Sequence, residues 1–421
     1  MDALIPRPDG ERIVVIGSGF AGLRFCRRLS GSQFQVVLID RHNYHQFQPL
    51  LYQVATAGLA PSAIAFPTRK LFRKSPNVYF RMAEVAQISP SKNEVLTSVG
   101  SIHYDHLVIA TGATNNFFGN TDIERNALTM KSVEEALWLR NLLLENFEKA
   151  LTTEDPEMKH SLLNVVIVGG GPTGVELAGA LAEMKNYVLP KDYPEIDFDQ
   201  MKITLVEASP HLLSGMSKQS SDAARGFLKD LGVDVLLNSQ VTGYDGNKAI
   251  IEGKTPMVTK NLIWAAGIKA NSPEGLPKDV LGKSGRLNTD GFHRIEGFSN
   301  IYAIGDVALM KCDDFPNGHP QVAQVAIQMA DNLARNLVSG KLEAFSYKEL
   351  GYMATVGRSK AVVDFSRFHL QGFIAWILWL FVHLMQILGV KNKFFIFIDW
   401  MWYYLTFDQS LRLVIKQKPN P

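Results

Sequence analysis

The chain has 421 residues, of which 46% are hydrophobic and 20% charged, a composition typical of a globular protein with two or three domains. It excludes a disordered or collagen-like protein. The 43 basic and 41 acidic residues give a net charge of +2, too small to indicate a nucleic-acid partner. The two cysteines, Cys26 and Cys312, are far apart, which excludes a disulfide framework and a zinc-ligand spacing and fits a reducing compartment.

Two stretches of the chain match each other, which indicates a duplicated unit. The first runs from 13–22 to 107–112, and the second runs from 165–174 to 262–267. The opening and closing glycines are 95 residues apart in the first copy and 98 in the second. Each copy opens with a β-branched run of the kind found in buried parallel strands, followed by G-x-G-x-x-G. We therefore predict an α/β protein with two Rossmann-like dinucleotide-binding domains.

The glycines of this motif have separate tasks. One allows a tight turn, one lets backbone N–H groups approach a pyrophosphate, and one lets the following helix pack close to the strand. Helical patterns follow both motifs, over 23–29 and 175–184. The pyrophosphate is expected at the positive N-terminus of each helix.

An acidic residue is expected at the end of the second strand of each copy, where it binds ribose hydroxyls. Asp40 stands 18 residues after Gly22, and Glu207 stands 33 residues after Gly174. We attribute the longer spacing to an inserted loop over 186–200. Glu207 would repel a 2′-phosphate, which favours NADH over NADPH, although His211 leaves NADPH open.

A later segment, 297–307, is expected to be a strand that ends in Gly-Asp. The dipeptide by itself favours an ordinary turn at the end of a strand. Together with the two motifs, it resembles the two-dinucleotide-binding-domain flavoprotein superfamily. That resemblance implies FAD contacts at Gly17, Gly19, Phe20, Ala21, Gly22, Asp40, Val85, Thr111, Gly112, Asp306, Ala323 and Gln324. It implies NADH contacts at Gly169, Gly171, Pro172, Thr173, Gly174, Glu176, Glu207, Ala266 and Gly267.

Cysteine usage separates the members of this superfamily. The disulfide reductases carry a Cys-x4-Cys pair just after the first ribose acid, and segment 41–58 of this chain contains no cysteine. Sulfide:quinone oxidoreductases also use cysteines. We expect Cys26 to be a small buried hydrophobe, and Cys312 alone cannot perform dithiol chemistry.

Four further segments, 47–55, 172–176, 323–328 and 356–361, resemble the type II NADH dehydrogenase family, the non-proton-pumping NADH:quinone oxidoreductases. The resemblance implies two-electron (hydride) transfer from NADH through FAD to a membrane quinone, ubiquinone or menaquinone, in a respiratory chain. Two alternatives remain open. One is a soluble FAD-dependent NADH reductase with a protein acceptor, and the other is a non-enzymatic redox sensor.

The same resemblance suggests four catalytic residues. Gln324 and Gln328 share one helix face after Pro320, which is expected in the first turn, and would contact the quinone. Glu176, near a helix N-terminus, would handle a proton or position NADH, and Lys360 would contact the quinone. The simpler alternatives are a solvated helix face, complementation of the helix dipole and a surface lysine.

The C-terminal part is apolar. Between Arg367 and Lys391 stand 23 residues without Lys, Arg, Asp or Glu, long enough for a membrane span. A helical projection nevertheless favours an amphipathic helix lying in the membrane interface. One stripe holds Gly372, Trp376, Trp379, His383 and Gln386, and the other holds Ile374, Ile377, Phe381, Leu384 and Leu388.

An aromatic segment, 394–404, follows, and basic residues flank it. The cations would attract anionic lipid. They are Lys391, Lys393, Arg412, Lys416 and Lys418. A dimerisation surface or a core helix pair is the alternative, and the two can coexist.

We expect four regions: the first part of an FAD domain (1–120), an inserted NADH domain (121–285), the second part of the FAD domain (286–345) and a region for membrane association and dimerisation (346–421). The N-terminal sequence does not resemble a signal peptide. We therefore expect a homodimer bound peripherally to the cytoplasmic face of a bacterial inner (plasma) membrane, with a quinone and the lipid surface as partners. No metal or nucleic acid is expected.

Overall fold

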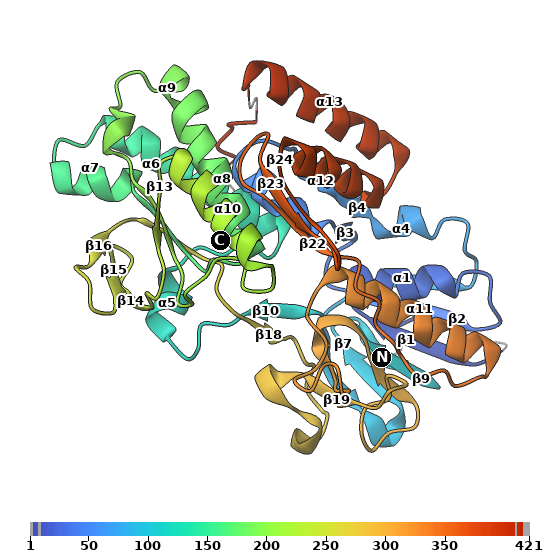
Figure 1. Ribbon diagram of the computed structural model, residues 1–421. Helices are drawn as coiled ribbons and strands as arrows, with labels where there is room; N and C mark the ends of the chain where they lie inside the picture. Colours follow the sequence, from blue (N-terminus) through green and yellow to red (C-terminus); the bar gives the residue numbers. More distant parts are fainter. Residues whose placement is uncertain (1–2, 7–9, 409–410, 416–421) are drawn as a thin grey trace. The chain divides into compact units, whose positions relative to one another are not determined.

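The computed structural model describes residues 3–6, 10–408 and 411–415 (Figure 1). Contacts within the chain divide it into two compact units, each built from three segments. The first unit consists of Met1–Gln46, Phe66–Thr114 and Ile268–Glu349. The second consists of Phe47–Ala65, Asn115–Gly267 and Leu350–Pro421.

The first unit is built on a five-stranded parallel sheet in the order β20-β9-β1-β2-β5. The central strand, β1, is fully buried, as expected for a β-branched run covered on both faces. The strands are β1 (Arg12–Ile16), β2 (Gln35–Asp40), β5 (Val78–Met82), β9 (His106–Ile109) and β20 (Ile301–Ala303).

Helices α1 (Phe20–Arg28) and α11 (Ala323–Ser339) pack against each other in this unit. Asp331 of α11 binds Arg24 at 2.7 Å and Arg28 at 2.6 Å. The remaining elements include α4 (Thr68–Leu71), β3 (Tyr44–Gln46), β19 (Leu287–Thr289) and β21 (Ala308–Met310).

The second unit repeats this plan with a four-stranded parallel sheet in the order β13-β12-β11-β17. Its first strand, β11, is buried along its whole length, like β1. The strands are β11 (Val165–Val168), β12 (Ile203–Val206), β13 (Val233–Leu236) and β17 (Asn261–Trp264).

Both repeats also carry an antiparallel three-stranded sheet between their third and fourth parallel strands. In the first unit it is β6 (Val85–Ser89), β7 (Glu94–Thr97) and β8 (Gly100–His103). In the second it is β14 (Val241–Tyr244), β15 (Lys248–Ile251) and β16 (Met257–Val258). The duplication predicted from the glycine motifs therefore extends over the whole nucleotide-binding fold.

The segment expected to be an inserted loop, 186–200, is largely helical, so that prediction is wrong. Helix α8 (Pro172–Glu183) continues through a π-helical turn, Met184–Val188, into α9 (Leu189–Asp192). Pro190 is compatible with this because it lies in the first turn of α9, where its missing N–H would be unpaired in any case. A 3₁₀ helix, Phe198–Gln200, follows.

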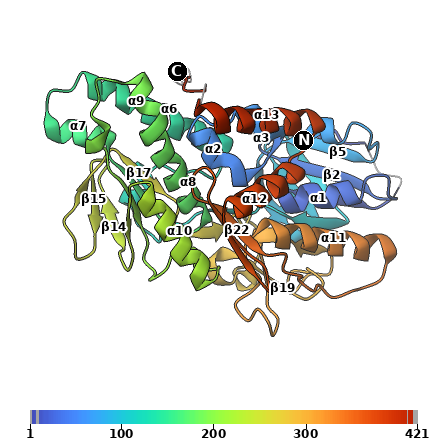
Figure 2. The same cartoon turned by 45° about the horizontal axis from the view of Figure 1, so that its top comes forward.

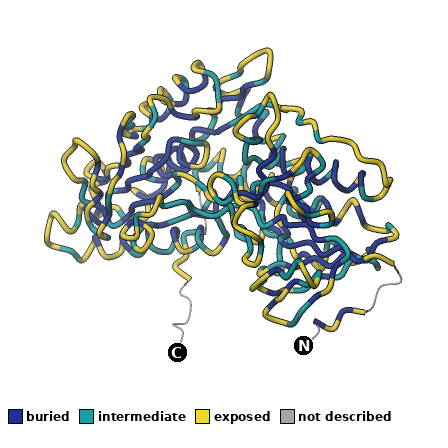
Figure 3. Tube along the Cα trace, turned by 90° about the horizontal axis from the view of Figure 1, so that it is seen from below, coloured by how far each residue is buried: buried dark blue, intermediate teal, exposed yellow. Residues whose placement is uncertain are grey.

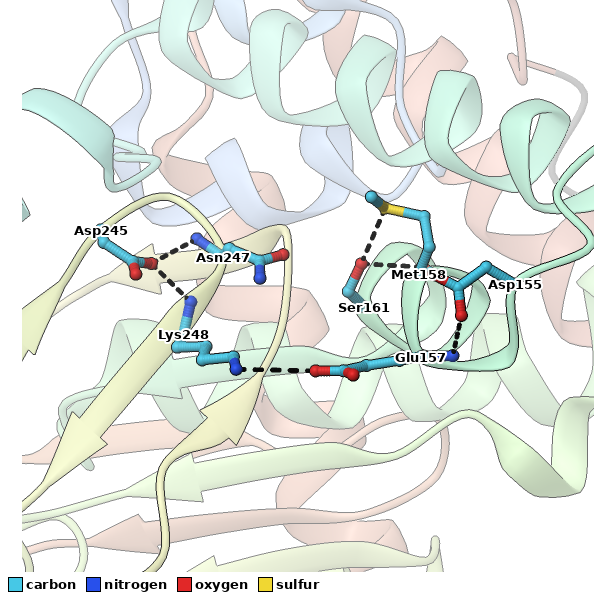
Figure 4. Close-up of polar contacts among 7 residues, drawn as sticks. All are labelled: Asp155, Glu157, Met158, Ser161, Asp245, Asn247 and Lys248. Atoms are coloured by element: carbon cyan, nitrogen blue, oxygen red, sulfur yellow. Dashed lines mark hydrogen bonds and ion pairs between the residues drawn. The ribbon is translucent and has the colours of Figure 1, made fainter.

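The other helices of the second unit include α6 and α7, which pack against each other. Helix α7 begins after Asp155, whose carboxylate accepts from the Glu157 N–H at 3.0 Å (Figure 4). Glu157 also pairs with Lys248 of β15 at 3.6 Å, which joins this helix to the antiparallel sheet. The helices are α2 (Leu51–Ala55), α3 (Pro61–Ile64), α5 (Thr121–Asn126), α6 (Val133–Leu151), α7 (Pro156–Leu163) and α10 (Lys218–Asp230).

The C-terminal residues from Leu350 onward are grouped with the second unit by their contacts. An antiparallel sheet precedes two helices that pack on each other (Figure 2). Asp364 of this sheet accepts from the N–H of Ser217 at 2.5 Å, at the start of α10. The elements are β22 (Tyr352–Thr355), β23 (Ala361–Asp364), β24 (His369–Gly372), α12 (Phe373–Gln386) and α13 (Val390–Thr406).

Buried residues lie in the interior of each unit, and exposed residues concentrate in the outer loops (Figure 3). The largest side chains without solvent contact include Phe25 in the first unit and Trp379 in the second. Trp379 and His383 of the stripe that begins at Gly372 are buried, whereas Gln386 is exposed, so the middle of this stripe faces the protein.

Candidate active site

The first glycine-rich loop leaves no room for side chains at its first and third glycines. Gly17 has a φ of +100°, and a Cβ there would lie 2.4 Å from the carbonyl oxygen of Ala110. A Cβ on Gly22 would lie 1.9 Å from the carbonyl oxygen of Gly17, so α1 can approach the loop only without one. A Cβ on Gly19 would meet nothing within 4 Å. The loop thus has an open side, as a phosphate-binding turn requires.

The second loop repeats this geometry. Gly169 has a φ of +110°, and a Cβ there would lie 2.8 Å from the carbonyl oxygen of Ala265. A Cβ on Gly174 would lie 1.9 Å from the carbonyl oxygen of Gly169, and Gly171 again borders open space. The next residues, Pro172 and Thr173, are exposed, and Pro172 opens helix α8. They border the same open side.

Each strand-end acid is bonded to its own glycine-rich loop. Asp40 accepts from the Ser18 N–H at 2.6 Å and from the Ser18 hydroxyl at 2.8 Å. Glu207 accepts from the Gly170 N–H at 2.5 Å and from the Ser209 N–H at 2.7 Å. The acids therefore hold the backbone of the loops. Their spacing in the sequence indicated the ribose role but not these bonds.

The late Gly-Asp segment lies beside the first loop. A Cβ on Gly305, which has a φ of +76°, would lie 3.1 Å from Cβ of Ala21 and 3.4 Å from Cβ of Ala326. The turn that carries Asp306 therefore meets the starts of both α1 and α11. Helix α11 begins at Ala323, so Pro320, expected in its first turn, lies before the helix. Gln324 is in the first turn.

Two further observations suit a flavin nucleotide in the first unit. The Thr111 hydroxyl is buried and has no hydrogen-bond partner among the described residues, so it is available to a ligand. Gly112, which follows it, has a φ of +70°. The Ala83 N–H donates to the carbonyl of Asp40 at 2.9 Å, which places the start of β6, at Val85, near the ribose acid. These residues fit FAD.

In the second unit, the end of β17 closes on the second loop. The Ala265 N–H donates to Val168 at 2.8 Å, and a Cβ on Gly169 would lie 2.9 Å from Cα of Ala266. Gly267 has a φ of +72°, as Gly112 has in the first unit. The end of β17, at Ala265 and Ala266, therefore lies against the second glycine-rich loop.

Glu176 is buried in the first part of α8, with 7% of its surface exposed. Its Oε1 lies 3.4 Å from the N–H of Thr355, a long hydrogen bond. Burial raises the pKa of Glu176 to about 8, and the N–H groups of Thr355 and Trp379 partly oppose this rise. The carboxyl is therefore mostly protonated at neutral pH.

A polar network missed by the sequence analysis surrounds this acid. The Tyr52 hydroxyl lies 3.1 Å from the Thr355 hydroxyl and accepts from the Gln53 amide at 2.9 Å. Gln53 accepts in turn from the indole N–H of Trp400 at 2.8 Å. Segment 47–55 carried a family resemblance, but nothing in its sequence assigned roles to Tyr52 or Gln53.

A second buried acid, Glu183, lies two helical turns after Glu176. It accepts from the hydroxyl of Tyr403 at 3.0 Å and from the backbone N–H of Arg358. Burial raises its pKa. Glu183 therefore links α8 both to the turn after β22 and to α13.

Two predicted quinone residues already have protein partners. The Gln328 amide donates to the carbonyl of Lys348 at 2.8 Å, and its oxygen accepts from the Lys348 N–H at 2.9 Å. Lys360 pairs with Asp230 of α10 at 3.0 Å and lies above the ring of Phe227. Gln324 and Gln328 belong to the first unit, and Lys360 and Glu176 belong to the second.

The cysteines differ in exposure. Cys26 is buried in α1, and burial raises the pKa of its thiol, which confirms that it is a buried hydrophobic residue. Cys312 is exposed. Among residues 3–6, 10–408 and 411–415, no group of three or more His, Cys, Asp or Glu could hold a metal ion.

Helices α12 and α13 expose apolar and aromatic side chains. Ile374, Ile377 and Phe381 of the predicted apolar stripe are 70%, 46% and 60% exposed. Leu388 lies beyond the end of α12. No helix in the described part of the chain has the length and apolar character needed to cross a membrane. The expected lipid contacts of Lys416 and Lys418 lie outside the described residues.

Comparison with known proteins supports a nucleotide-binding oxidoreductase fold. Residues 11–330 match the family model for pyridine nucleotide-disulphide oxidoreductases, and residues 350–406 match the NDH2 C-terminal domain. The fold is similar to the structure of NDH2 from Plasmodium falciparum in complex with NADH, with a TM-score of 0.87 and 22% identity, covering 96% of this chain and 100% of that one. The fold and the paired cradles thus define a flavoprotein of the pyridine nucleotide-disulphide oxidoreductase class.

Two relatives from Mycobacterium tuberculosis show which family within this class the chain belongs to. The type II NADH:quinone oxidoreductase Ndh is 34% identical, over 95% of this chain and 89% of the relative. The type II NADH:quinone oxidoreductase NdhA is 33% identical, over 93% and 86%. The chain belongs to the type II NADH:quinone oxidoreductase family.

Proposed function

We propose that this protein oxidises NADH and reduces a membrane quinone through bound FAD by two-electron transfer, without pumping protons. The observation that carries the proposal is the pair of matched glycine-rich cradles, each closed by its own ribose acid. One protein that binds two dinucleotides can pass a hydride between them. The family membership narrows the acceptor to a quinone.

In this proposal the chain supplies binding and orientation. FAD, when bound, supplies the chemistry of accepting a hydride and delivering two electrons. Residues of the first loop, with Thr111 and Asp306, would hold it in the first unit. The second loop and Glu207 would hold NADH and fix its nicotinamide for transfer.

Glu176 is proposed to supply a proton for quinol formation. Its burial keeps the carboxyl protonated near neutral pH, which is the form that can donate. The Thr355 N–H would stabilise the carboxylate left after donation. The neighbouring hydrogen bonds, from Trp400 through Gln53, fix the Tyr52 hydroxyl near this acid.

We propose Gln324, in the first turn of α11, as a quinone contact. A helix N-terminus favours the negative charge that develops on reduction of the flavin or the quinone. Gln328 would have to release the backbone of Lys348, and Lys360 would have to release Asp230, before either could bind the quinone.

The exposed face of α12 and α13 is proposed to lie on the lipid surface, at the cytoplasmic face of a bacterial plasma membrane. Ile374→Ser combined with Phe381→Ser should weaken binding to vesicles of anionic lipid by at least about tenfold, since each side chain contributes about 1.5–3 kcal/mol when buried. The control is Ile250→Ser, which removes a 50% exposed side chain from β15. Equal loss of vesicle binding in the control would contradict the assignment.

We also propose that the protein forms a homodimer. Analytical ultracentrifugation in detergent tests this.

The experiment that tests the function follows the visible spectrum of the purified protein without oxygen. We expect a flavin absorption band that NADH bleaches and a short-chain quinone restores. A protein that reduces a ferredoxin-type acceptor but no quinone would support the rival soluble reductase. A colourless protein that takes up no FAD on reconstitution would refute the proposal.

A further inference from the structure

His45 contacts the glycine-rich loop of the first unit on both sides of its second glycine. Its Nδ1 lies 2.9 Å from the carbonyl oxygen of Ser18. Its ring also packs edge-on against Phe20, with 5.4 Å between ring centroids. His45 and Ser18 are 4% and 3% exposed. Because a carbonyl can only accept, the imidazole donates from Nδ1.

This hydrogen bond fixes the peptide plane between Ser18 and Gly19. In a trans peptide the carbonyl and the N–H point in opposite directions, so the N–H of Gly19 is directed away from the imidazole. Asp40 holds the preceding N–H of Ser18 at 2.6 Å. The residue before the second glycine is therefore held from two directions, while Gly19 itself borders open space.

The second unit makes the same bond with a different donor. Gly170 is the counterpart of Ser18, and its carbonyl accepts from the backbone N–H of Leu213 at 2.8 Å. Its N–H donates to Glu207, as that of Ser18 donates to Asp40. Two unrelated donors thus hold the same carbonyl in the two cradles. We conclude that the bond serves the cradle and is more than a local packing contact.

We propose that His45 is a positioning residue for FAD: by holding the Ser18 carbonyl, it orients the Gly19 N–H toward the pyrophosphate of the cofactor. This inference rests on the proposed function, which places FAD in the first unit. Burial lowers the pKa of His45, so the ring is neutral at physiological pH and keeps a single donor for Ser18.

The test compares FAD binding among variants of the full chain. His45→Leu leaves a buried carbonyl unpaired and should raise the FAD dissociation constant about tenfold, measured by the fluorescence of released flavin. His45→Asn places an amide nitrogen near the position of Nδ1 and should restore the affinity to within about threefold. The ³¹P resonances of the bound pyrophosphate should shift in the Leu variant and return toward wild type in the Asn variant.

The control is His293→Leu, which removes another buried histidine of the same unit, bonded to Asn332 at 2.8 Å. It should lower thermal stability without moving the ³¹P resonances. NADH affinity, measured by quenching of tryptophan fluorescence, should stay within twofold in every variant, because the second cradle uses Leu213.

Equal FAD affinity in wild type and His45→Leu, or equal ³¹P shifts in His45→Leu and the control, would overturn the inference. If His45→Leu does not fold, His45→Asn is compared with His45→Gln, whose amide extends beyond the Nδ1 position. Weaker FAD binding by the Gln variant alone supports the inference, and equal binding overturns it. A wild-type protein that binds no FAD would instead refute the proposed function.

Discussion

The two repeats share a backbone plan but differ two residues after the third glycine. The first repeat carries Arg24 there, which is 35% exposed in its side chain and pairs with Asp331. The second carries Glu176, which is 7% exposed and has its pKa raised to about 8 by burial. The same scaffold therefore supports a surface ion pair in one copy and a buried acid in the other. Glycine spacing determines the cradle, whereas the elements that cover the helix determine the chemistry.

The covering elements come from different parts of the chain. Helix α1 packs against α11, whose Asp331 provides an anion. Helix α8 packs against β22, whose Thr355 N–H donates to the acid. Asp331 gives Arg24 a charged partner, while the carboxyl of Glu176 under a strand retains its proton. Substitutions in matched pairs test how far this comparison holds.

The largest effects are expected at the third glycines. Gly22→Ala should abolish FAD binding and Gly174→Ala should abolish NADH binding, each by more than about 100-fold, because a Cβ would lie 1.9 Å from a carbonyl oxygen. Flavin absorbance and NADH titration measure the two losses. Gly226→Ala, where a Cβ meets nothing within 4 Å, should leave both unchanged. Loss of FAD in Gly174→Ala would show that the cradles are not independent.

The ribose acids come next. Asp40→Asn should weaken FAD binding and Glu207→Gln should weaken NADH binding, each by about 10- to 100-fold, because a charged hydrogen bond contributes about 1.5–3 kcal/mol. Each variant serves as the control for the other, since its effect should stay within its own unit. Fluorescence of released flavin and NADH titration provide the readouts. If both variants weakened the binding of the same cofactor, the two acids would not serve separate cradles.

A smaller, pH-dependent effect is expected at Glu176. Quinone reduction by wild type should fall as pH rises through about 8, where the carboxyl loses its proton, and Glu176→Gln should be about tenfold slower at neutral pH without this fall. Arg24→Gln, at the matched position, should keep the wild-type profile. Turnover of Glu176→Gln that equals wild type would remove the proposed role.

The same acid should affect stability. Its folded-state pKa lies above its unfolded value of about 4.5, so the folded state binds more protons between about pH 4.5 and 8. Its contribution to stability is therefore present at low pH and is lost as pH rises through about 8. The melting temperature of wild type should fall over this range more steeply than that of Glu176→Gln. Parallel curves for the two proteins would show that the acid does not titrate as described.

The smallest effect is expected at Lys360, which lies in the second unit. The Lys360 and Asp230 side chains are 34% and 64% exposed, so Lys360→Gln should cost less than about 1 kcal/mol in unfolding free energy. Denaturant titration measures this cost. The KM for a short-chain quinone should change by less than about threefold. A larger rise in KM would mean that Lys360 leaves Asp230 to bind the quinone.

The sequence was sufficient to predict the parallel strands and the two loops, because glycine spacing and β-branched runs act over a few residues. It could not predict contacts between residues that lie far apart in the chain. The affiliation of the C-terminal residues with the second unit depends on bonds such as that from Ser217 to Asp364, 147 residues apart. The amide of Gln328 is likewise held by a backbone 20 residues away.

The discontinuity of the first unit has a consequence for synthesis. The sheet of the second unit lies within 165–264, whereas the first sheet takes its edge strand β20 from residues 301–303. At about 5–20 residues per second, β9 leaves the ribosome roughly 10 to 40 seconds before β20 arrives. During that time the edge of β9 is an unpaired template for misassociation. A chaperone acting during translation would therefore protect the first unit. The second unit has all the strands of its parallel sheet before β20 is made.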